Sequence, residues 1–330
     1  MPIDRAEAEL LGRLKPFAEE DRARTWRATL STLGLVVAAG FVAGAARHGC
    51  VRATASILEG LLLVRGFSIF HDAMHGAVFR GSSVGRSLWS AFGLLVLTPS
   101  RAWRDSHNYH HAKNGQIVGS QIGAYPVMTV AMWTRATRSQ KMRYRLARHP
   151  LGIAFGYLTT FAHGMCIAPF LRDPKVHFAG PVALALHGVL LAGTWRLGGP
   201  SLCASIVVVP MGLATALGSY LFYAQHNFPS VRIRPRERWT YASAAVEYAS
   251  YLEAGPVFAW LTGNIGVHHV HHLNPLVPFY RLYEAMRGVP ELRTPPNNSL
   301  HPAHVLACFR GNLWSPEDGR MVPYPNERAA

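Results

Sequence analysis

The chain has 330 residues, of which 49% are hydrophobic and 15% are charged, and its formal net charge is +15 at pH 7. Soluble globular proteins average roughly 25% charged residues, so the composition argues against an ordinary water-soluble protein. The basic excess is uneven, with nine Lys/Arg and one acid, Asp105, between Arg101 and Arg148. Because no Gly/Ser-rich linker or internal repeat divides the chain, we expect a single domain over residues 1–330.

The N-terminal region mixes acids and bases without a short apolar core, so we do not expect a cleaved signal peptide. A helix with Leu10, Leu11, Leu14 and Phe17 on one face is expected there. Such a helix either lies on the membrane surface or packs on the domain. The four cysteines show neither metal-finger spacing nor a disulfide framework, and free thiols are expected.

Four stretches are apolar and close to the roughly 20 residues that a membrane-spanning helix needs. They are residues 26–46, 53–70, 179–195 and 202–224. A further apolar stretch, 151–171, is interrupted by glycines and Pro169. If it also crossed, His226 and the histidines at 268–272 would lie about 30 Å from those at 71–111, on the opposite face of the membrane. We therefore expect 151–171 to be re-entrant or interfacial.

This arrangement predicts an all-α integral membrane protein with four transmembrane helices and a helical cap. The cap comprises residues 71–178 and 225–330. The basic stretch between Arg101 and Arg148 then lies in the cytoplasm, as the positive-inside tendency requires. The histidine-rich segments lie in the cap, so they also face the cytoplasm. We expect no nucleic-acid partner.

Nine histidines lie next to these apolar stretches, in three clusters and one single position. The clusters are His71 and His75; His107, His110 and His111; and His268, His271 and His272; the single residue is His226. Residues i, i+3 and i+4 share one face of a helix, so each cluster presents two or three imidazoles in one direction. His269 breaks this spacing and is expected to point elsewhere. Three such clusters on one side of a membrane indicate a shared metal site.

The ligand type narrows the choice of metal. Imidazole suits Zn, Cu, Fe and Ni, whereas a structural zinc site closes with four ligands and often uses Cys. Nine histidines without Cys or an obvious carboxylate favour a non-haem di-iron centre with four or five ligands per metal. Candidates for orienting the rings are Asp72, Asn108, Gln225 and Asn264. Asn264 alternatively caps the helix that begins before the third cluster.

These motifs resemble those of the membrane fatty-acid desaturases. The resemblance rests on His-Asp-x-x-His at 71–75, His-x-x-His-His at 107–111 and 268–272, and Gln225-His226. The run at 262–275, followed by Pro278-Phe-Tyr-Arg-Leu, is most similar to bacterial acyl-lipid desaturases. The resemblance implies a stem of four helices in a bacterial cytoplasmic membrane and a cytosolic cap that holds two iron ions. The implied ligands are His71, His75, His107, His110, His111, His226, His268, His271 and His272.

The resemblance also implies an O2-dependent reaction that removes two hydrogens from adjacent carbons in the acyl chain of a membrane lipid. Side-chain acid–base chemistry cannot break such unactivated C–H bonds. Because the chain shows no haem or flavin motif, the electrons are expected from a separate donor such as a ferredoxin. The basic stretch 101–148 would attract either an acidic donor or anionic lipid headgroups.

Alternatives remain at this point. The motif His-Asp-Ala-Met-His-Gly also resembles carotenoid ketolases, so a di-iron hydroxylase or ketolase is the second hypothesis. A histidine-rich metal transporter would carry ligands through its spans, whereas these are expected just past the span ends. Four aromatic residues either line an acyl tunnel or belong to the core. They are Trp103, Tyr223, Phe258 and Trp260.

Overall fold

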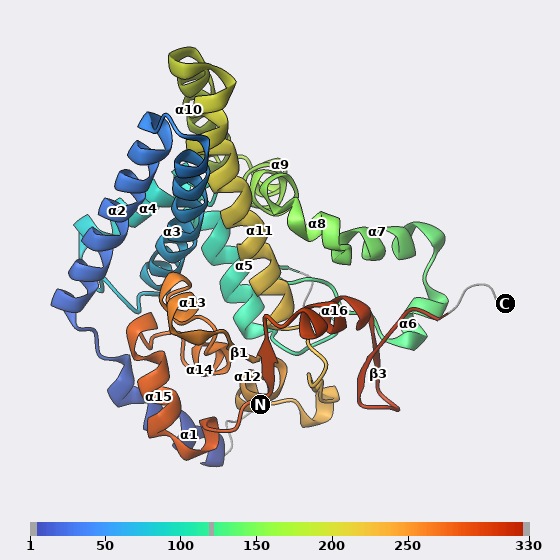
Figure 1. The fold of residues 1–330 in the computed structure, drawn as a ribbon. Helices are drawn as coiled ribbons and strands as arrows, with labels where there is room; N and C mark the ends of the chain where they lie inside the picture. Colours follow the sequence, from blue (N-terminus) through green and yellow to red (C-terminus); the bar gives the residue numbers. More distant parts are fainter. Residues whose placement is uncertain (1–4, 119–121, 326–330) are drawn as a thin grey trace.

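The computed structural model describes residues 5–118 and 122–325, and helices make up most of it (Figure 1). The strands of this part of the chain are short and form two two-stranded sheets. In one, β1 (Tyr251–Glu253) runs parallel to β2 (Asn297–Ser299); in the other, β3 (Leu313–Ser315) runs antiparallel to β4 (Arg320–Val322). The expected all-α class is confirmed, with these strands as minor additions.

Among residues 5–118 and 122–325, three helical segments are long and apolar enough to cross a membrane. They are α2 (Arg22–Ala45), α3 (Gly49–His75) and the continuous run of α10 (Ala179–Cys203), η3 (Ala204–Val208) and α11 (Val209–Ala224). The last run has 46 residues, which would extend about 69 Å if straight, more than twice the hydrocarbon thickness. It instead turns at Gly198 and Gly199, whose backbone angles are not helical.

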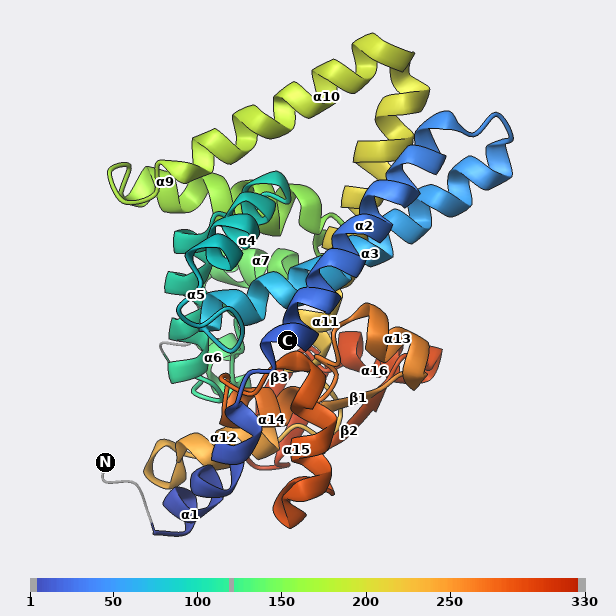
Figure 2. The same cartoon turned by 90° about the vertical axis from the view of Figure 1, so that its left-hand side faces the viewer.

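This turn divides the run into two legs, one before Gly198 and one after Gly199. The turn lies at the same end of the molecule as the turn between α2 and α3 (Figure 2). The expected spans 179–195 and 202–224 lie within the long segments, and the expected span 26–46 extends one residue past the end of α2. The count of four crossings stays a prediction, because length and composition identify three candidate segments.

The expected second span, 53–70, lies within α3, and its bounds stay a prediction, because the helix is longer than the span. Helix α3 continues to His75 and ends only at Gly76, which takes the left-handed conformation (φ 77°) typical of a helix C-cap. The first histidine cluster therefore lies in the last turn of a long helix and not after it. Residues 151–171 fall in three short elements, α8 (Pro150–Ala154), η2 (Tyr157–Ile167) and α9 (Ala168–Arg172). None of the three is long enough to be a candidate span.

Shorter elements fill the two segments expected to form the cap. Between α3 and α8 lie α4 (Ser83–Leu95), α5 (Ser100–Ala112), α6 (Val130–Arg135) and α7 (Arg138–Arg148). After α11 come η4 (Arg236–Arg238), α12 (Tyr241–Tyr248), α13 (Gly255–Leu261), α14 (His268–Leu273), η5 (Phe279–Arg281), α15 (Leu282–Gly288), η6 (Pro290–Leu292) and α16 (Pro302–Arg310). Of these, α5 and α14 carry the second and third histidine clusters.

The N-terminal helix α1 (Arg5–Leu14) and the turn η1 (Lys15–Ala18) pack on the domain. Leu14 is fully buried in a core cluster that also contains Val270 and Leu273 of α14. Leu10, Leu11 and Phe17 pack against the same cluster. Of the two alternatives for the predicted amphipathic helix, the structure therefore shows the one in which it packs on the domain, beneath the third histidine cluster.

Helix α3 packs between α2 and α11 and is the most buried of the long helices. By contrast, large apolar side chains stay exposed along α2 and α10. They include Leu30, Val37 and Phe41 on α2, and Val182, Val189, Trp195 and Leu197 on α10. Such surfaces are stable next to lipid rather than water, which agrees with the length and composition of these helices.

Gly60 tests the close packing of α3 against α11. A Cβ atom at Gly60 would lie 2.9 Å from the Pro210 carbonyl oxygen and 3.0 Å from Leu213 Cδ2. We expect Gly60→Val to destabilise the protein by about 2 kcal/mol, seen as a lower melting midpoint in detergent. The control is Gly188→Ala on α10, where a Cβ meets nothing within 4 Å. Equal melting midpoints for the two variants would contradict the packing.

Candidate metal centre

Helix α3 carries the first histidine cluster into the interior. His71 is buried and His75 is half-buried, one turn apart at the C-terminal end of this helix. Their rings lie 4.7 Å apart between centroids. Because α3 is a continuous helix that ends at Gly76, the positions of both rings are set by the same rigid element.

Helix α5 carries His107, His110 and His111, all buried. Trp103, one turn earlier, stacks on the His107 ring with a centroid distance of 4.4 Å. The same indole meets the His71 ring edge-on at 5.2 Å, so it packs α5 against the end of α3. The first two clusters therefore meet through direct aromatic contacts.

The third cluster reaches α3 through the loop that precedes α14. Ser68, one turn before His71, donates a hydrogen bond from Oγ to the Thr262 carbonyl at 2.8 Å. Gly263 lies so close to α3 that a Cβ there would be 2.6 Å from Ser68 Cβ. Gln225, at the end of α11, donates from Nε2 to the Ile265 carbonyl at 2.8 Å. These bonds place His226 and α14 beside the first two clusters.

The nine histidines converge into two adjacent groups. The first histidine group is His71, His75, His107 and His271, and the second is His110, His226, His268 and His272. Within each group the candidate ligand atoms lie within 4.8 Å of one another. His111 joins them: its Nε2 is 3.1 Å from that of His107 and 3.0 Å from that of His271, while its ring stacks 4.3 Å from His272.

The close contacts between ring nitrogens identify what these groups can bind. The Nε2–Nε2 distances are 3.1 Å for His71–His107 and His110–His226, 3.3 Å for His110–His272, and 3.0 Å for His226–His268 and His268–His272. The Nδ1–H of His71 donates to Asp72, and that of His226 donates to the Tyr248 carbonyl. A neutral imidazole has one N–H, so the Nε2 atoms of these two rings are bare acceptors. Bare nitrogens that converge in this way fit a shared cation.

Burial keeps these imidazoles neutral. It lowers the pKa of His226 to about 3, and it lowers the pKa values of His107, His110 and His271 well below the ordinary 6.5. The charge of neighbouring histidines lowers the last three further. The rings are therefore unprotonated at pH 7, and this is the form that binds a metal.

Of the four polar residues expected to orient the rings, one bonds to a histidine ring, two bond to backbone carbonyls and one is exposed. Asp72 is buried and accepts from His71 Nδ1 at 3.0 Å and from the Phe279 backbone N–H at 2.6 Å. Gln225 and Asn264 instead donate to backbone carbonyls, and so they hold loops rather than rings. The alternative role of Asn264 as a helix cap is wrong, because α14 begins after Val267 without a side-chain cap. Asn108 is exposed.

His269 points away from both groups, as its spacing predicts. It is fully buried, and its Nε2 lies 3.2 Å from the Leu292 carbonyl oxygen. It therefore has a structural partner although its neighbours in sequence belong to the candidate centre.

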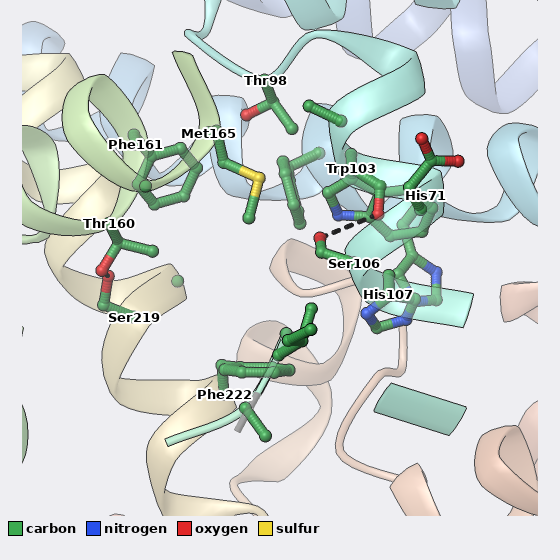
Figure 3. A pocket seen from close by; sticks show the side chains of 18 of the residues that line it. His71, Thr98, Trp103, Ser106, His107, Thr160, Phe161, Met165, Ser219 and Phe222 are labelled. Carbon is green, nitrogen blue, oxygen red and sulfur yellow. Dashed lines mark hydrogen bonds between the residues drawn. The ribbon is translucent and has the colours of Figure 1, made fainter. Parts of the chain in front are cut away.

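A cavity of about 550 Å³ opens beside the histidines and touches both groups through His71, His107 and His268. Its wall is largely apolar, and Figure 3 shows Trp103, Phe161, Met165 and Phe222 around it. Asp105 and Arg172 are exposed members of its lining. The cavity therefore combines an apolar interior with charged groups where it meets the surface, and its size is typical of a ligand site.

Of the four aromatic residues considered for a tunnel, Trp103 lines this cavity. Tyr223 instead bonds to Asn227 and Arg148, and Trp260 packs under the Arg65 guanidinium. Phe258 is not among the lining residues. The wall also uses η2 and α11, including Gly164 and Gly218, which the sequence did not single out as site residues. The glycine interruptions of 151–171 were the available signal.

Known proteins match most of this chain. The sequence profile of the fatty acid desaturase family matches residues 49–302, which include all nine histidines. A fatty acid desaturase of Bacillus subtilis (strain 168) is 32% identical over 277 residues, covering 82% of this chain and 76% of that protein. An sn-1 oleoyl-lipid 12-desaturase of Anabaena variabilis is 23% identical over 296 residues, covering 84% of this chain and 79% of that protein. A chloroplastic sn-2 acyl-lipid omega-3 desaturase (ferredoxin) of Helianthus annuus is 22% identical over 274 residues, covering 75% of this chain and 58% of that protein.

A matched pair of variants tests the candidate ligands. His271 lies in the first histidine group, whereas His269, two residues earlier, does not. We expect His271→Gln to lower the metal content of the purified protein and His269→Gln to leave it unchanged, since glutamine can still donate to Leu292. Metal analysis of membrane-inserted, detergent-purified protein measures both. Equal metal content in the two variants would contradict the assignment.

Proposed function

Since the chain belongs to the fatty acid desaturase family, whose members are oxidoreductases, we propose an O2-dependent di-iron enzyme that introduces a double bond into the acyl chain of a membrane lipid. The observation that carries this proposal is the convergence of nine imidazoles at the wall of an apolar cavity.

The first and second histidine groups would each hold one iron. His111 would complete the first group, because its Nε2 is close to those of His107 and His271. Bound iron would supply the O2-dependent chemistry that removes two hydrogens from adjacent carbons, which side-chain acids and bases cannot do. Asp72 would hold the His71 ring so that its bare Nε2 faces the metal.

The cavity would hold the acyl chain. Its apolar wall would exclude water from the reacting carbons, and His71, His107 and His268 at its edge would place those carbons next to both metals. The exposed charged groups, Asp105 and Arg172, would face the polar part of the lipid. This division of apolar interior and charged rim matches the chemistry of an acyl lipid.

We propose that α2, α3 and the two legs of Ala179–Ala224 cross a bacterial cytoplasmic membrane, and that the whole chain is one domain. Supporting this, the α2–α3 turn and the turn at Gly198 and Gly199 lie at the same end of the molecule (Figure 2). His71 and His75 lie at the other end of α3, and His226 follows the other end of α11. The basic stretch 101–148 contains α5 with the second cluster, which favours a cytoplasmic position for the histidines. The electrons would come from a separate donor such as a ferredoxin, which appears in the name of the Helianthus annuus relative.

Lipid analysis tests the proposed reaction. We expect membranes of a bacterial host that lacks polyunsaturated lipids to gain acyl chains two mass units lighter when the protein is expressed. Mass spectrometry after derivatisation locates the new double bond. The His271→Gln variant, expressed at the same level, should give none. A gain of one oxygen atom instead of the loss of two hydrogens would contradict desaturation and indicate a hydroxylase or ketolase.

Two glycines on α11 test the cavity as the acyl site. Gly218 lines the cavity, and a Cβ there would lie 3.8 Å from Phe161 Cζ, so a larger side chain would project into the space. We expect Gly218→Leu to reduce conversion of long acyl chains about tenfold, as over-filling a packed space costs one to three kcal/mol. Gly212→Leu is the control, since that glycine has free space and does not line the cavity. Equal conversion by both variants would contradict the assignment.

A further inference from the structure

Arginine occupies every second position from Arg232 to Arg238, just after the segment that carries His226. We call residues 232–238 the arginine segment. All four arginines are exposed. Arg234 forms a bidentate ion pair with Glu247, at 2.6 and 2.7 Å. Among residues 5–118 and 122–325, no ion pair is found for the other three, and Glu237 is the one acid within the segment.

This charge is not accompanied by exposed apolar side chains. No large apolar residue between 210 and 256 is exposed, although the basic helix α7 exposes Met142 and Leu146. A basic helix that also exposes apolar side chains suits a membrane surface, whereas charge alone suits a soluble partner. The arginine segment lies near α12, at the end of the molecule opposite to the α2–α3 turn (Figures 1 and 2). It therefore faces away from the part of the protein that would meet the bilayer.

The residues that follow the arginine segment form hydrogen bonds next to the second and third histidine clusters. Trp239 donates from Nε1 to the Asn114 carbonyl at 2.8 Å, and Asn114 lies three residues after His111 of α5. Tyr241 donates from Oη to the backbone carbonyl of His272 at 2.5 Å, on α14. The surface is thus connected to His111 and to the second histidine group by two short hydrogen-bonded routes.

We propose that the arginine segment is the docking surface for a small acidic protein that carries one electron at a time. This proposal rests on the proposed function, and it assigns a surface to the electron donor of the same site. Of the two alternatives for stretch 101–148, an acidic donor or anionic lipid headgroups, it favours the headgroups, because α7 within that stretch exposes apolar side chains beside its charges. Electrons delivered here would enter next to the two histidine groups.

The electron count requires an external reductant, and a one-electron carrier meets it in two steps. Breaking two C–H bonds and forming one C=C bond releases two electrons and two protons from the acyl chain. Reduction of one O2 to two water molecules consumes four electrons and four protons. The missing two electrons come from two reduced carrier molecules, each oxidised by one electron, and the missing two protons come from water.

Charge reversal on the two basic surfaces tests the proposal. The full-length, iron-loaded protein is placed in nanodiscs of neutral phosphatidylcholine, with a purified acidic ferredoxin and its reductase as the probe. We expect the double variant Arg236→Glu/Arg238→Glu to raise the KM for ferredoxin about tenfold and to weaken its salt dependence, because charges at an interface rim act mainly on encounter. Iron content and the rate with dithionite as a chemical reductant should stay unchanged. The control is Arg138→Glu/Arg143→Glu on α7, which should leave the KM unchanged.

An unchanged KM in the arginine-segment variant would overturn the proposal, and so would a larger effect in the α7 variant. A defect that appears in anionic but not in neutral nanodiscs would also overturn it, since it would identify the segment as a lipid contact. Direct ferredoxin binding, measured without turnover, separates this proposal from the proposed function. Wild-type protein that binds ferredoxin but forms no double bond with dithionite would refute the desaturase activity while leaving the docking surface standing.

Discussion

The structure depends on the convergence of histidine nitrogens in a water-poor interior. Each buried polar atom without a partner costs about 1–3 kcal/mol, and imidazoles that meet Nε2 to Nε2 cannot all satisfy one another. The contacts of His226 with His110 and His268, near 3 Å, show this conflict directly. Two metal ions would resolve it, since each accepts several lone pairs at once. The proposed irons would therefore stabilise the fold as well as supply the chemistry.

Bonds that do not involve a metal hold the histidine-bearing elements in place. Ser68 ties α3 to the loop before α14, Asp72 ties the end of α3 to Phe279, and Gln225 ties the end of α11 to the same loop. All three are buried and lie within three residues of a candidate ligand. A site supported in this way keeps its geometry before the metal arrives. The adjoining cavity then borders both histidine groups on one side.

The spacing of the clusters predicted which histidines share a face, because i, i+3 and i+4 are neighbours on any helix. It also separated His269 from its neighbours. The end of α3 at Gly76 is likewise a signal that the local sequence does contain. Other features required tertiary contacts that local sequence does not contain. The role of Asn264 follows from a bond to the Phe279 carbonyl, and the cavity follows from how η2 packs on α11.

The central claim is that both histidine groups hold iron through imidazole nitrogen. X-ray absorption at the iron edge of the purified wild-type protein tests it most directly. The account predicts an iron signal equivalent to one ion per histidine group, with a first shell dominated by histidine nitrogen and a second iron in the outer shell. A protein that carries no iron after expression in iron-replete medium, or iron bound mainly through sulfur, would contradict it.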